Sequence, residues 1–285
     1  MPAPGSALTP VNPVFLVDLF PELHAELMRL LGAMRPDEWG KPTACALWSV
    51  KDIVAHLLDG ALRRLSYGRD GMEPAADQPI TTYADLVGYL NRLNTDWVAA
   101  ARRLSPRLLL DMVDLAGSEL CDYFRTLDPH ASARFGVAWA GEEASPNWFD
   151  IGREYTERWL HQQQIRDAIG ATPLTARKWL HPTLDIFMRA LPFTYREVDA
   201  EVGRGIQVEI EGEAGGLWTL KRMADGWRLF SGSDGSAGTR VSLPQDAAWK
   251  LFSKGLAPEH ARRSIRIEGD LRLGQPLLGA LAIMA

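Results

Sequence analysis

The sequence predicts an α+β protein of two domains, an N-terminal up-down helical bundle and a smaller α+β domain with an antiparallel-rich sheet. The first observation is length, because 285 residues are more than one hydrophobic core usually supports. Apolar residues then recur with helical spacing over residues 14–169, and after Gly170 they alternate with the period of strands. We therefore expect one domain over residues 1–172 and a second over residues 173–285.

The N-terminal half contains segments of helical periodicity separated by clusters of Pro and Gly, which are typical of connections. The expected helices span residues 14–34, 49–67, 83–104, 106–127 and 147–169. The start of the second is the best marked. Ser49 can cap it with its hydroxyl, while Asp52 at the third helical position can accept from the backbone of Ser49.

The C-terminal half reads as strands followed by helices. Residues 206–211 alternate strictly, and turn signals separate them from two further short apolar runs. The expected strands span residues 206–211, 217–220, 227–230, 239–243 and 264–268, the first three antiparallel. We also expect a helix over residues 244–254 that ends at Gly255, and a closing helix over residues 270–284.

Composition excludes several classes of protein. With 46% hydrophobic and 24% charged residues the chain is of ordinary globular type, and its net charge of −5 without a dense Lys/Arg run argues against a nucleic-acid partner. No stretch is long and apolar enough to cross a bilayer, and residues 1–13 do not resemble a signal peptide, so we expect a cytoplasmic protein without a membrane partner. Cys45 and Cys121 are too few and too distant for a disulfide framework or a CxxC metal site.

The run from Glu157 to His161 places a carboxylate and an imidazole four residues apart, on one face of a helix. Both can reach one ion, and a catalytic zinc site needs three protein ligands and an open position. His56 is the best third ligand. It lies in the middle of the second helix at the edge of the apolar stripe, roughly 60° beyond Ile53 at about 100° per residue.

Other interpretations of these residues remain open from spacing alone. A Glu–His pair four residues apart is also typical of a solvated ion pair on a helix surface. A lone histidine such as His56 is more often a hydrogen-bonded residue at the edge of a core than a metal ligand. Cys45, eleven positions before His56, could be a fourth ligand or a nucleophile, although a free cysteine is usually a small buried hydrophobic residue.

A family resemblance adds to these observations. Residues 36–57 read PDEWGKPTACALWSVKDIVAHL, which resembles the opening signature of the mycothiol-dependent maleylpyruvate isomerase family, part of the DinB-like metal-binding superfamily. Residues 153–170 resemble that family's second metal-binding helix, with Glu157 and His161 at the expected offset. Residues 241–285 are similar to its sterol-carrier-like second domain, so the resemblance spans nearly the whole chain.

The resemblance implies a DinB-like bundle and a sterol-carrier-like domain, with a divalent metal, zinc by preference, held by His56, Glu157 and His161. It implies a low-molecular-weight thiol such as mycothiol as cofactor, and isomerisation or transfer on a small electrophilic acid. A metal-bound thiol is deprotonated, which would supply a nucleophilic thiolate. The family also uses an arginine of its second domain. Arg222, Arg240 and Arg266 are all candidates here, so the catalytic and cofactor-binding residues stay unassigned.

Two positions depart from the family pattern. Leu47 stands where the family usually has glycine before the tryptophan, and Gln164 stands where it usually has aspartate three residues after the ligand histidine. A residue at the second of these positions can orient a metal ligand, so the change affects metal affinity and the polarity of the site.

Two alternatives to a thiol-dependent enzyme follow from the same residues. In a metal-assisted hydrolase the ion would activate water, with Glu154 as the nearby general base. In a non-catalytic metal- and ligand-binding protein, the C-terminal domain would offer an apolar pocket. For the protein as a whole we expect a small-molecule substrate as partner, no nucleic acid and no membrane, and a monomer or homodimer.

Overall fold

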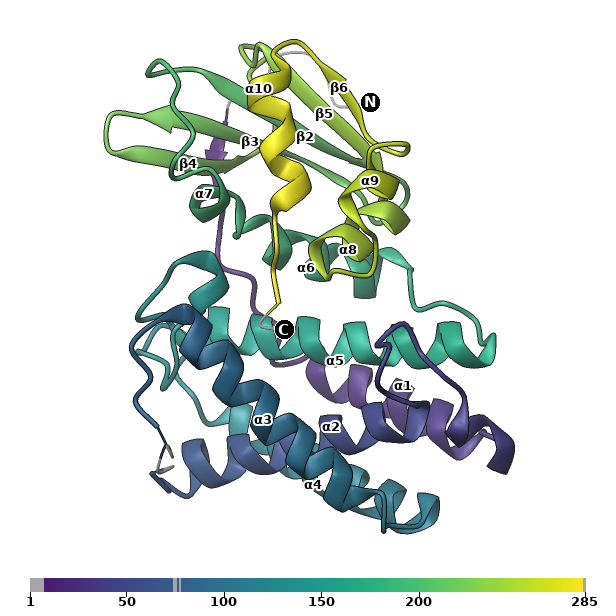
Figure 1. The fold of residues 1–285 in the computed structure, drawn as a ribbon. Helices are drawn as coiled ribbons and strands as arrows, with labels where there is room; N and C mark the ends of the chain where they lie inside the picture. The colour runs from purple at the N-terminus through teal and green to yellow at the C-terminus, as the bar shows by residue number, and fades with distance from the viewer. Residues whose placement is uncertain (1–7, 74–75, 77, 284–285) are drawn as a thin grey trace. The chain divides into compact units, whose positions relative to one another are not determined.

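The computed structural model describes residues 8–73, 76 and 78–283. The described residues divide into two compact units (Figure 1). The bundle unit comprises residues 15–135 and 146–174, and the sheet unit comprises residues 8–14, 136–145 and 175–283. One unit is helical and the other contains a sheet, which confirms the α+β fold class. The segments 8–14 and 136–145 group with the sheet unit, and the domain ranges 1–172 and 173–285 stay predictions.

All five helices expected in the bundle unit are present. They are α1 (Phe20–Gly32), α2 (Val50–Arg64), α3 (Tyr83–Ala101), α4 (Pro106–Arg125) and α5 (Asn147–Ile169). The largest difference is at α1, which begins at Phe20 rather than near residue 14. Pro21 occupies its first turn, where the ring's fixed φ and missing N–H are tolerated.

The start of α2 has the predicted capping box. The Ser49 hydroxyl accepts from the Asp52 amide at 3.3 Å, and the Asp52 carboxylate accepts from the Ser49 amide at 3.0 Å. The helix continues into a π-helical turn over Leu65–Arg69. Because π-turns shift the register of side chains, the end of this helix departs from a regular 3.6-residue pattern.

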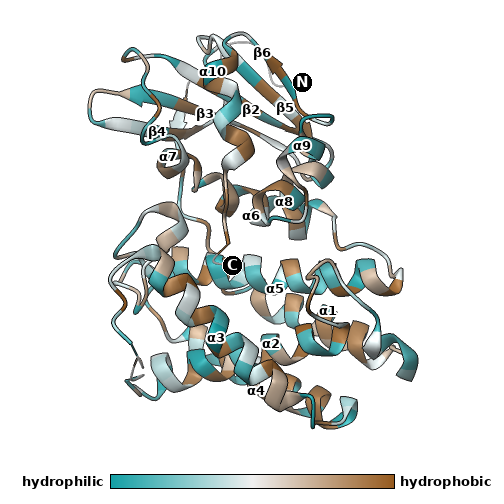
Figure 2. Cartoon of the chain, viewed as in Figure 1, coloured by the Kyte–Doolittle hydropathy of each residue, from teal (hydrophilic) through white to brown (hydrophobic). Residues whose placement is uncertain are grey.

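Helix α5 is buried on nearly all sides. It packs against α1 and α2, and its buried residues include both Trp159 and Gln162. The Trp159 indole donates to the Leu174 carbonyl at 2.9 Å, and the Gln162 amide donates to the Leu23 carbonyl at 3.2 Å. Figure 2 shows hydrophilic and hydrophobic residues mixed along this helix. The bundle therefore carries polar side chains within its interior, each in need of a partner.

The sheet unit contains a six-stranded sheet in the order β1-β4-β3-β2-β5-β6. Its strands are β1 (Thr9–Pro10), β2 (Gly205–Glu211), β3 (Gly216–Met223), β4 (Gly226–Ser231), β5 (Thr239–Pro244) and β6 (Arg266–Glu268). All neighbours are antiparallel except β2 and β5, which pair in parallel. The five predicted strands are confirmed, and the short strand β1 was not predicted.

The helices of the sheet unit agree less well with expectation. They are α6 (Arg177–Met188), α7 (Leu191–Thr194), α8 (Gln245–Phe252), α9 (Pro258–Ala261) and α10 (Leu271–Gly274). The sequence did not predict α6, which contains Pro182, or α7. Proline inside a helix removes an amide donor and weakens the pattern from which helices are recognised.

Two predicted helix ends in the sheet unit are wrong. Helix α8 ends at Phe252, and the residue with positive φ that follows is Lys254, at 59°, rather than Gly255. The closing helix predicted over residues 270–284 is shorter, because α10 gives way to a 3-10 helix over Gln275–Gly279. Pro276 has no amide hydrogen to continue α-helical bonding. Residue 284 lies outside the described residues. Among the helices of the described chain, none has the length and apolarity needed to cross a membrane.

Candidate metal centre

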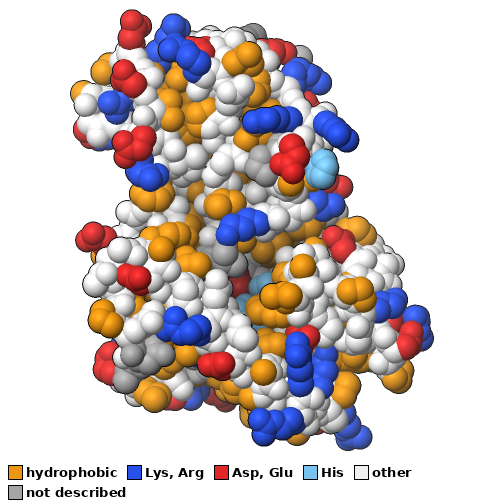
Figure 3. Space-filling model, in the orientation of Figure 1, with side chains coloured by type: hydrophobic (Ala, Val, Ile, Leu, Met, Phe, Trp, Pro, Cys, Tyr) orange, Lys and Arg blue, Asp and Glu red, His pale blue; other side chains and the backbone are white. Residues whose placement is uncertain are grey.

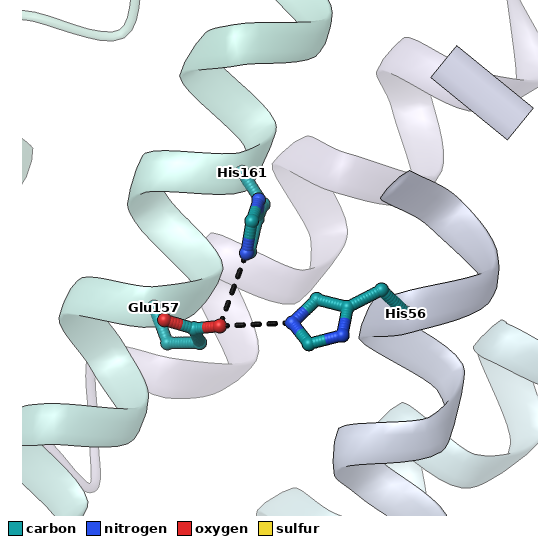
Figure 4. A group of neighbouring side chains, drawn as sticks. All are labelled: His56, Glu157 and His161. Carbon is teal, nitrogen blue, oxygen red and sulfur yellow. Dashed lines mark hydrogen bonds and ion pairs between the residues drawn. The ribbon is translucent and has the colours of Figure 1, made fainter. Parts of the chain in front are cut away.

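The three predicted ligands meet between two helices of the bundle unit. His56 comes from α2, and Glu157 and His161 come from adjacent turns of α5 (Figure 4). One ligand atom from each residue lies within 4.8 Å of the others. His56 and Glu157 are 101 positions apart in the chain, so the packing of α2 on α5 creates the cluster.

One carboxylate oxygen lies at the centre of this cluster. Glu157 Oε1 is 3.0 Å from His56 Nε2 and 3.0 Å from His161 Nε2. Ligands at about 2.0–2.2 Å from a tetrahedral ion are separated from one another by roughly 3.3 Å. A small adjustment of the side chains would therefore let all three bind one ion, and two imidazole nitrogens with one carboxylate oxygen form a donor set of catalytic zinc.

The cluster is buried on its histidine side and more open at the carboxylate. The side chains of His56 and His161 keep 10% and 9% of their surface exposed, whereas that of Glu157 keeps 36%. Three protein ligands leave a fourth position of a tetrahedral ion free. The exposure of Glu157 is consistent with access for a small molecule.

Burial and mutual charge set the protonation of these groups. Burial lowers the pKa of His56, although Glu157 opposes the shift. Burial would also lower the pKa of His161, but the charge and hydrogen bond of Glu157 outweigh it, so the pKa of His161 is raised. Burial would raise the pKa of Glu157, but its interactions with His161 and His56 bring it well below its usual range. The carboxylate is therefore ionised and suited to a cation.

Trp48 is a site residue that spacing did not reveal. Its ring lies 4.9 Å from the His56 ring and 6.3 Å from the His161 ring, measured between centroids. The loop before α2 holds it there, since the Trp48 amide donates to the Cys45 carbonyl and Thr43 Oγ1 donates to the Trp48 carbonyl, both at 2.8 Å. The available signal was its place in the family signature, one residue before the Ser49 cap.

Gln164 contacts the metal cluster from the position where the family usually has aspartate. Its side-chain oxygen lies 2.8 Å from His161 Nδ1 and 3.4 Å from Cys45 Sγ. The other ligand histidine differs, because His56 Nδ1 is buried and has no hydrogen-bond partner among the described residues. The structure thus places Cys45 beside the cluster, where it contacts the ligand His161 through Gln164.

The general base considered for a hydrolase is held in ion pairs. Glu154 Oε1 accepts from Arg64 at 3.0 Å, and Arg153 lies 3.2 Å from the same oxygen. Asp150 binds the same Arg64 guanidinium through both oxygens, each at 2.7 Å. This buried cluster occupies Glu154, so the structure does not favour it as a base.

The three candidate arginines lie on strands of the sheet unit, Arg222 on β3, Arg240 on β5 and Arg266 on β6. Arg240 is paired with Glu268 and Arg266 with Ser242 in the register of β5 and β6. None of these positions assigns a catalytic role.

Comparison with known proteins gives two kinds of match. The family model for the mycothiol maleylpyruvate isomerase N-terminal domain matches residues 20–166, just over half of the chain. A crystal structure of mycothiol-dependent maleylpyruvate isomerase superimposes with a TM-score of 0.54 at 12% identity, covering 90% of this chain and 92% of that one. A histidine-to-alanine variant of that isomerase matches with a TM-score of 0.53 and the same identity and coverage.

The two kinds of match carry different weight. At 12% identity the structural likeness shows the fold alone. No curated protein matches the sequence at a significant level. The family model, in contrast, covers α1 through most of α5 and includes all three residues of the candidate metal centre. The chain therefore belongs to the mycothiol maleylpyruvate isomerase family.

Proposed function

We propose that the protein is a metal-dependent enzyme that uses a low-molecular-weight thiol for isomerisation or transfer on a small electrophilic acid. The observation that carries the proposal is the meeting of two imidazole nitrogens and one carboxylate oxygen within 4.8 Å. Membership of the family adds the thiol, and His56, Glu157 and His161 would hold the ion. When bound, zinc lowers the pKa of a coordinating thiol enough to give a thiolate at neutral pH.

The chain's own cysteines are poor candidates for that nucleophile. Burial raises the pKa of the Cys45 thiol, and the charge of Glu157 acts in the same direction. Burial also raises the pKa of the Cys121 thiol. Because the thiolate is the reactive form, a thiol from solution is the better nucleophile.

Other residues of the site orient the ligands or restrict the access of water. The Trp48 ring lies against the imidazole of His56 and near that of His161, which would leave little room for water between these rings. Gln164 orients His161 through Nδ1. Glu157, the most exposed of the three ligands, lies on the side that a small molecule can reach.

The chemistry requires no oxidant or reductant. The thiolate adds to one carbon of a conjugated alkene acid, whose double bond becomes single and can rotate. Elimination of the same thiolate restores the double bond in the other geometry and returns the thiol unchanged. In a transferase the carbon–sulfur bond is kept, and the adduct takes up a proton.

We place this reaction in the cytoplasm, with a small molecule as the partner. On the face drawn in Figure 3, Lys and Arg side chains are interspersed with Asp and Glu. Such mixing gives no extended field of one sign to attract a nucleic acid.

A non-catalytic binding protein is the second candidate. The sheet unit has a mainly apolar hollow of about 240 Å³, lined by Leu251, Leu256 and Leu278 among others. An apolar ligand could occupy it. Co-purified lipid together with the absence of turnover would favour this candidate.

Elemental analysis of the purified protein tests the site. We expect about one zinc ion per chain in the wild type and in His260→Ala, a control at an exposed histidine of α9. We expect loss of the metal in His56→Ala and Glu157→Ala, because two ligands hold an ion far less tightly than three. Near-stoichiometric metal in both of these variants would exclude the site.

Calorimetric titration with mycothiol, bacillithiol and glutathione tests the thiol. Binding of one of them to zinc-loaded protein, and its loss after chelation, would support the proposed reaction. Turnover of an acid or ester substrate without any added thiol would favour the hydrolase instead.

A further inference from the structure

The side chains of Cys45, Gln164 and His161 form a chain of hydrogen bonds that ends at the metal cluster. Cys45 Sγ lies 3.4 Å from Gln164 Oε1, and the same oxygen lies 2.8 Å from His161 Nδ1. Gln164 is buried, and it lies three residues beyond His161 on α5. Cys45 therefore connects His161 to the loop before α2, outside the helix α5 that carries His161 and Gln164.

The orientation of the Gln164 amide decides which nitrogen of His161 can bind an ion. With Oε1 toward the ring, His161 must carry its hydrogen on Nδ1, which leaves the Nε2 lone pair free. With the amide nitrogen toward the ring, Nδ1 would have to accept and Nε2 would carry the hydrogen. Nε2 is the atom that lies 3.0 Å from Glu157, so the first orientation alone is suited to metal binding.

Cys45 favours this first orientation because a thiol is a hydrogen-bond donor. It can donate to the amide oxygen, whereas an amide nitrogen in the same place would meet only a weak sulfur acceptor. The backbone of the loop holds the thiol in position. The Cys45 amide donates to Thr43 Oγ1 at 3.2 Å, and its carbonyl accepts from the Trp48 amide at 2.8 Å.

We propose that Cys45 is a positioning residue for the metal centre. Its thiol holds the Gln164 oxygen toward His161, so that Nδ1 keeps its hydrogen and Nε2 faces the ion. The inference rests on the metal site of the proposed function but does not depend on the thiol reaction.

The proposal assigns different effects to different substitutions. Loss of a residue that orients a metal ligand typically weakens metal binding about 10- to 100-fold. We expect Gln164→Leu to lower zinc affinity by about tenfold. Cys45→Val, which has no donor, should lower it by a smaller factor, and Cys45→Ser should restore wild-type affinity because the hydroxyl donates in the same direction.

The experiment measures zinc affinity by competition with a chelator, and the Nδ1–H proton of His161 by NMR. In the wild type and in Cys45→Ser we expect this proton to be protected from exchange with solvent, in zinc-loaded and in metal-free protein. In Cys45→Val and Gln164→Leu we expect faster exchange. Cys121→Val, at the buried cysteine of α4, is the control and should behave as the wild type.

Equal zinc affinity and equal proton protection in Cys45→Val and Cys45→Ser would overturn the proposal. Because both variants lack the sulfur and they differ in the donor, a loss of stability common to both cannot explain a difference between them. If the wild type binds no zinc, the proposed function fails, and proton exchange in the metal-free protein still decides whether Cys45 positions Gln164. If zinc binds but no thiol does, the reaction fails and the positioning role is unaffected.

Discussion

Arg64 supplies a buried positive charge in the interior of the bundle unit. It is buried and binds both Asp150 and Glu154. Burial affects the pKa of Arg64 and the pKa of its partner Asp150 differently. The nearby carboxylates outweigh burial and raise the pKa of Arg64, whereas burial, together with Glu154, raises the pKa of Asp150 to about 6 despite the guanidinium. The two-bond geometry at 2.7 Å indicates ionised Asp150 at neutral pH, and Arg153 adds a second cation 2.8 Å from the same carboxylate.

Replacing Arg64 should destabilise the protein strongly. Arg64→Met removes the buried cation of Asp150 and Glu154 and leaves them, among the described residues, only their contacts with Arg153. Breaking a buried ion pair in this way typically costs about 3–5 kcal/mol. Arg69→Met is the control, because its ion pair with Glu119 is exposed and such pairs contribute about 0–1 kcal/mol. Urea unfolding measures both. A loss of less than 1 kcal/mol for Arg64→Met would mean that water or rearrangement compensates the carboxylates.

His24 gives a pH dependence of stability that does not involve the metal ligands. It is buried on α1, against Gly117, where a Cβ would lie 2.2 Å from its ring. Burial lowers its pKa, and the charge of Arg158 acts in the same direction. Asp114, exposed and 3.5 Å away, opposes the shift without cancelling it.

The sign follows from which state binds the proton first. Well above pH 6.5, the ordinary pKa of histidine, His24 is neutral in both the folded and the unfolded state and gives no pH dependence. Below it the unfolded chain takes up the proton more readily, so stability falls as the pH falls. We expect the wild type to lose more stability between about pH 7 and 5 than His24→Gln, measured by urea unfolding at each pH. The difference in unfolding free energy between the two proteins removes the contribution of Asp150, which both contain. If both lose the same stability over this pH range, the prediction is wrong.

At the scale of elements, the first turn of α2 links helix formation to the site. The Ser49 cap lies directly after Trp48, whose ring packs on both ligand histidines. Asp52, which completes the capping box, is also paired with Arg102 at 3.1 Å. Fraying of this turn would therefore move Trp48 as well as weaken the helix.

A pair of serine caps separates these two effects. Ser49→Ala and Ser105→Ala each remove a hydroxyl that accepts from a backbone amide, on α2 and α4 respectively. Each should lose about 1 kcal/mol of stability. Only Ser49→Ala should also weaken zinc binding, because only that cap adjoins the site. Equal zinc affinity in both variants would show that the position of Trp48 does not depend on the cap.

Local signals explain which elements the sequence could predict. Strong periodicity and a capping box identified α2, and a Gly-bounded alternating run identified β2. Helix α6 was not predicted because Pro182 lies within it. Tertiary packing of its apolar face stabilises the helix despite the proline. The parallel pairing of β2 with β5 joins strands that are far apart in the chain, and no local pattern encodes such a partner.

At the scale of the whole molecule, the same distinction applies to the candidate metal centre. The sequence of α5 alone predicts that Glu157 and His161 share one helix face, and the sequence of α2 alone predicts the edge position of His56. That they meet depends on the packing of α2 against α5, for which the family resemblance was the available guide. Cys45 and Trp48 reach the site through a loop, and no helical or strand period predicts where a loop places its side chains.

The ligands His56 and Glu157 are 101 positions apart in the chain and lie on different helices. The ion would therefore bind the folded bundle unit and not the unfolded chain. Free zinc at about 100 times its dissociation constant should then stabilise that unit by about 2.7 kcal/mol. The sheet unit is a separate compact unit without these ligands, so its unfolding should respond little to zinc.

We expect calorimetry with and without chelator to show a zinc-dependent shift of the bundle transition, absent in Glu157→Gln. An equal shift in Glu157→Gln would indicate zinc binding elsewhere in the chain. A wild-type transition that zinc leaves unmoved would mean that the three side chains meet without forming a metal site.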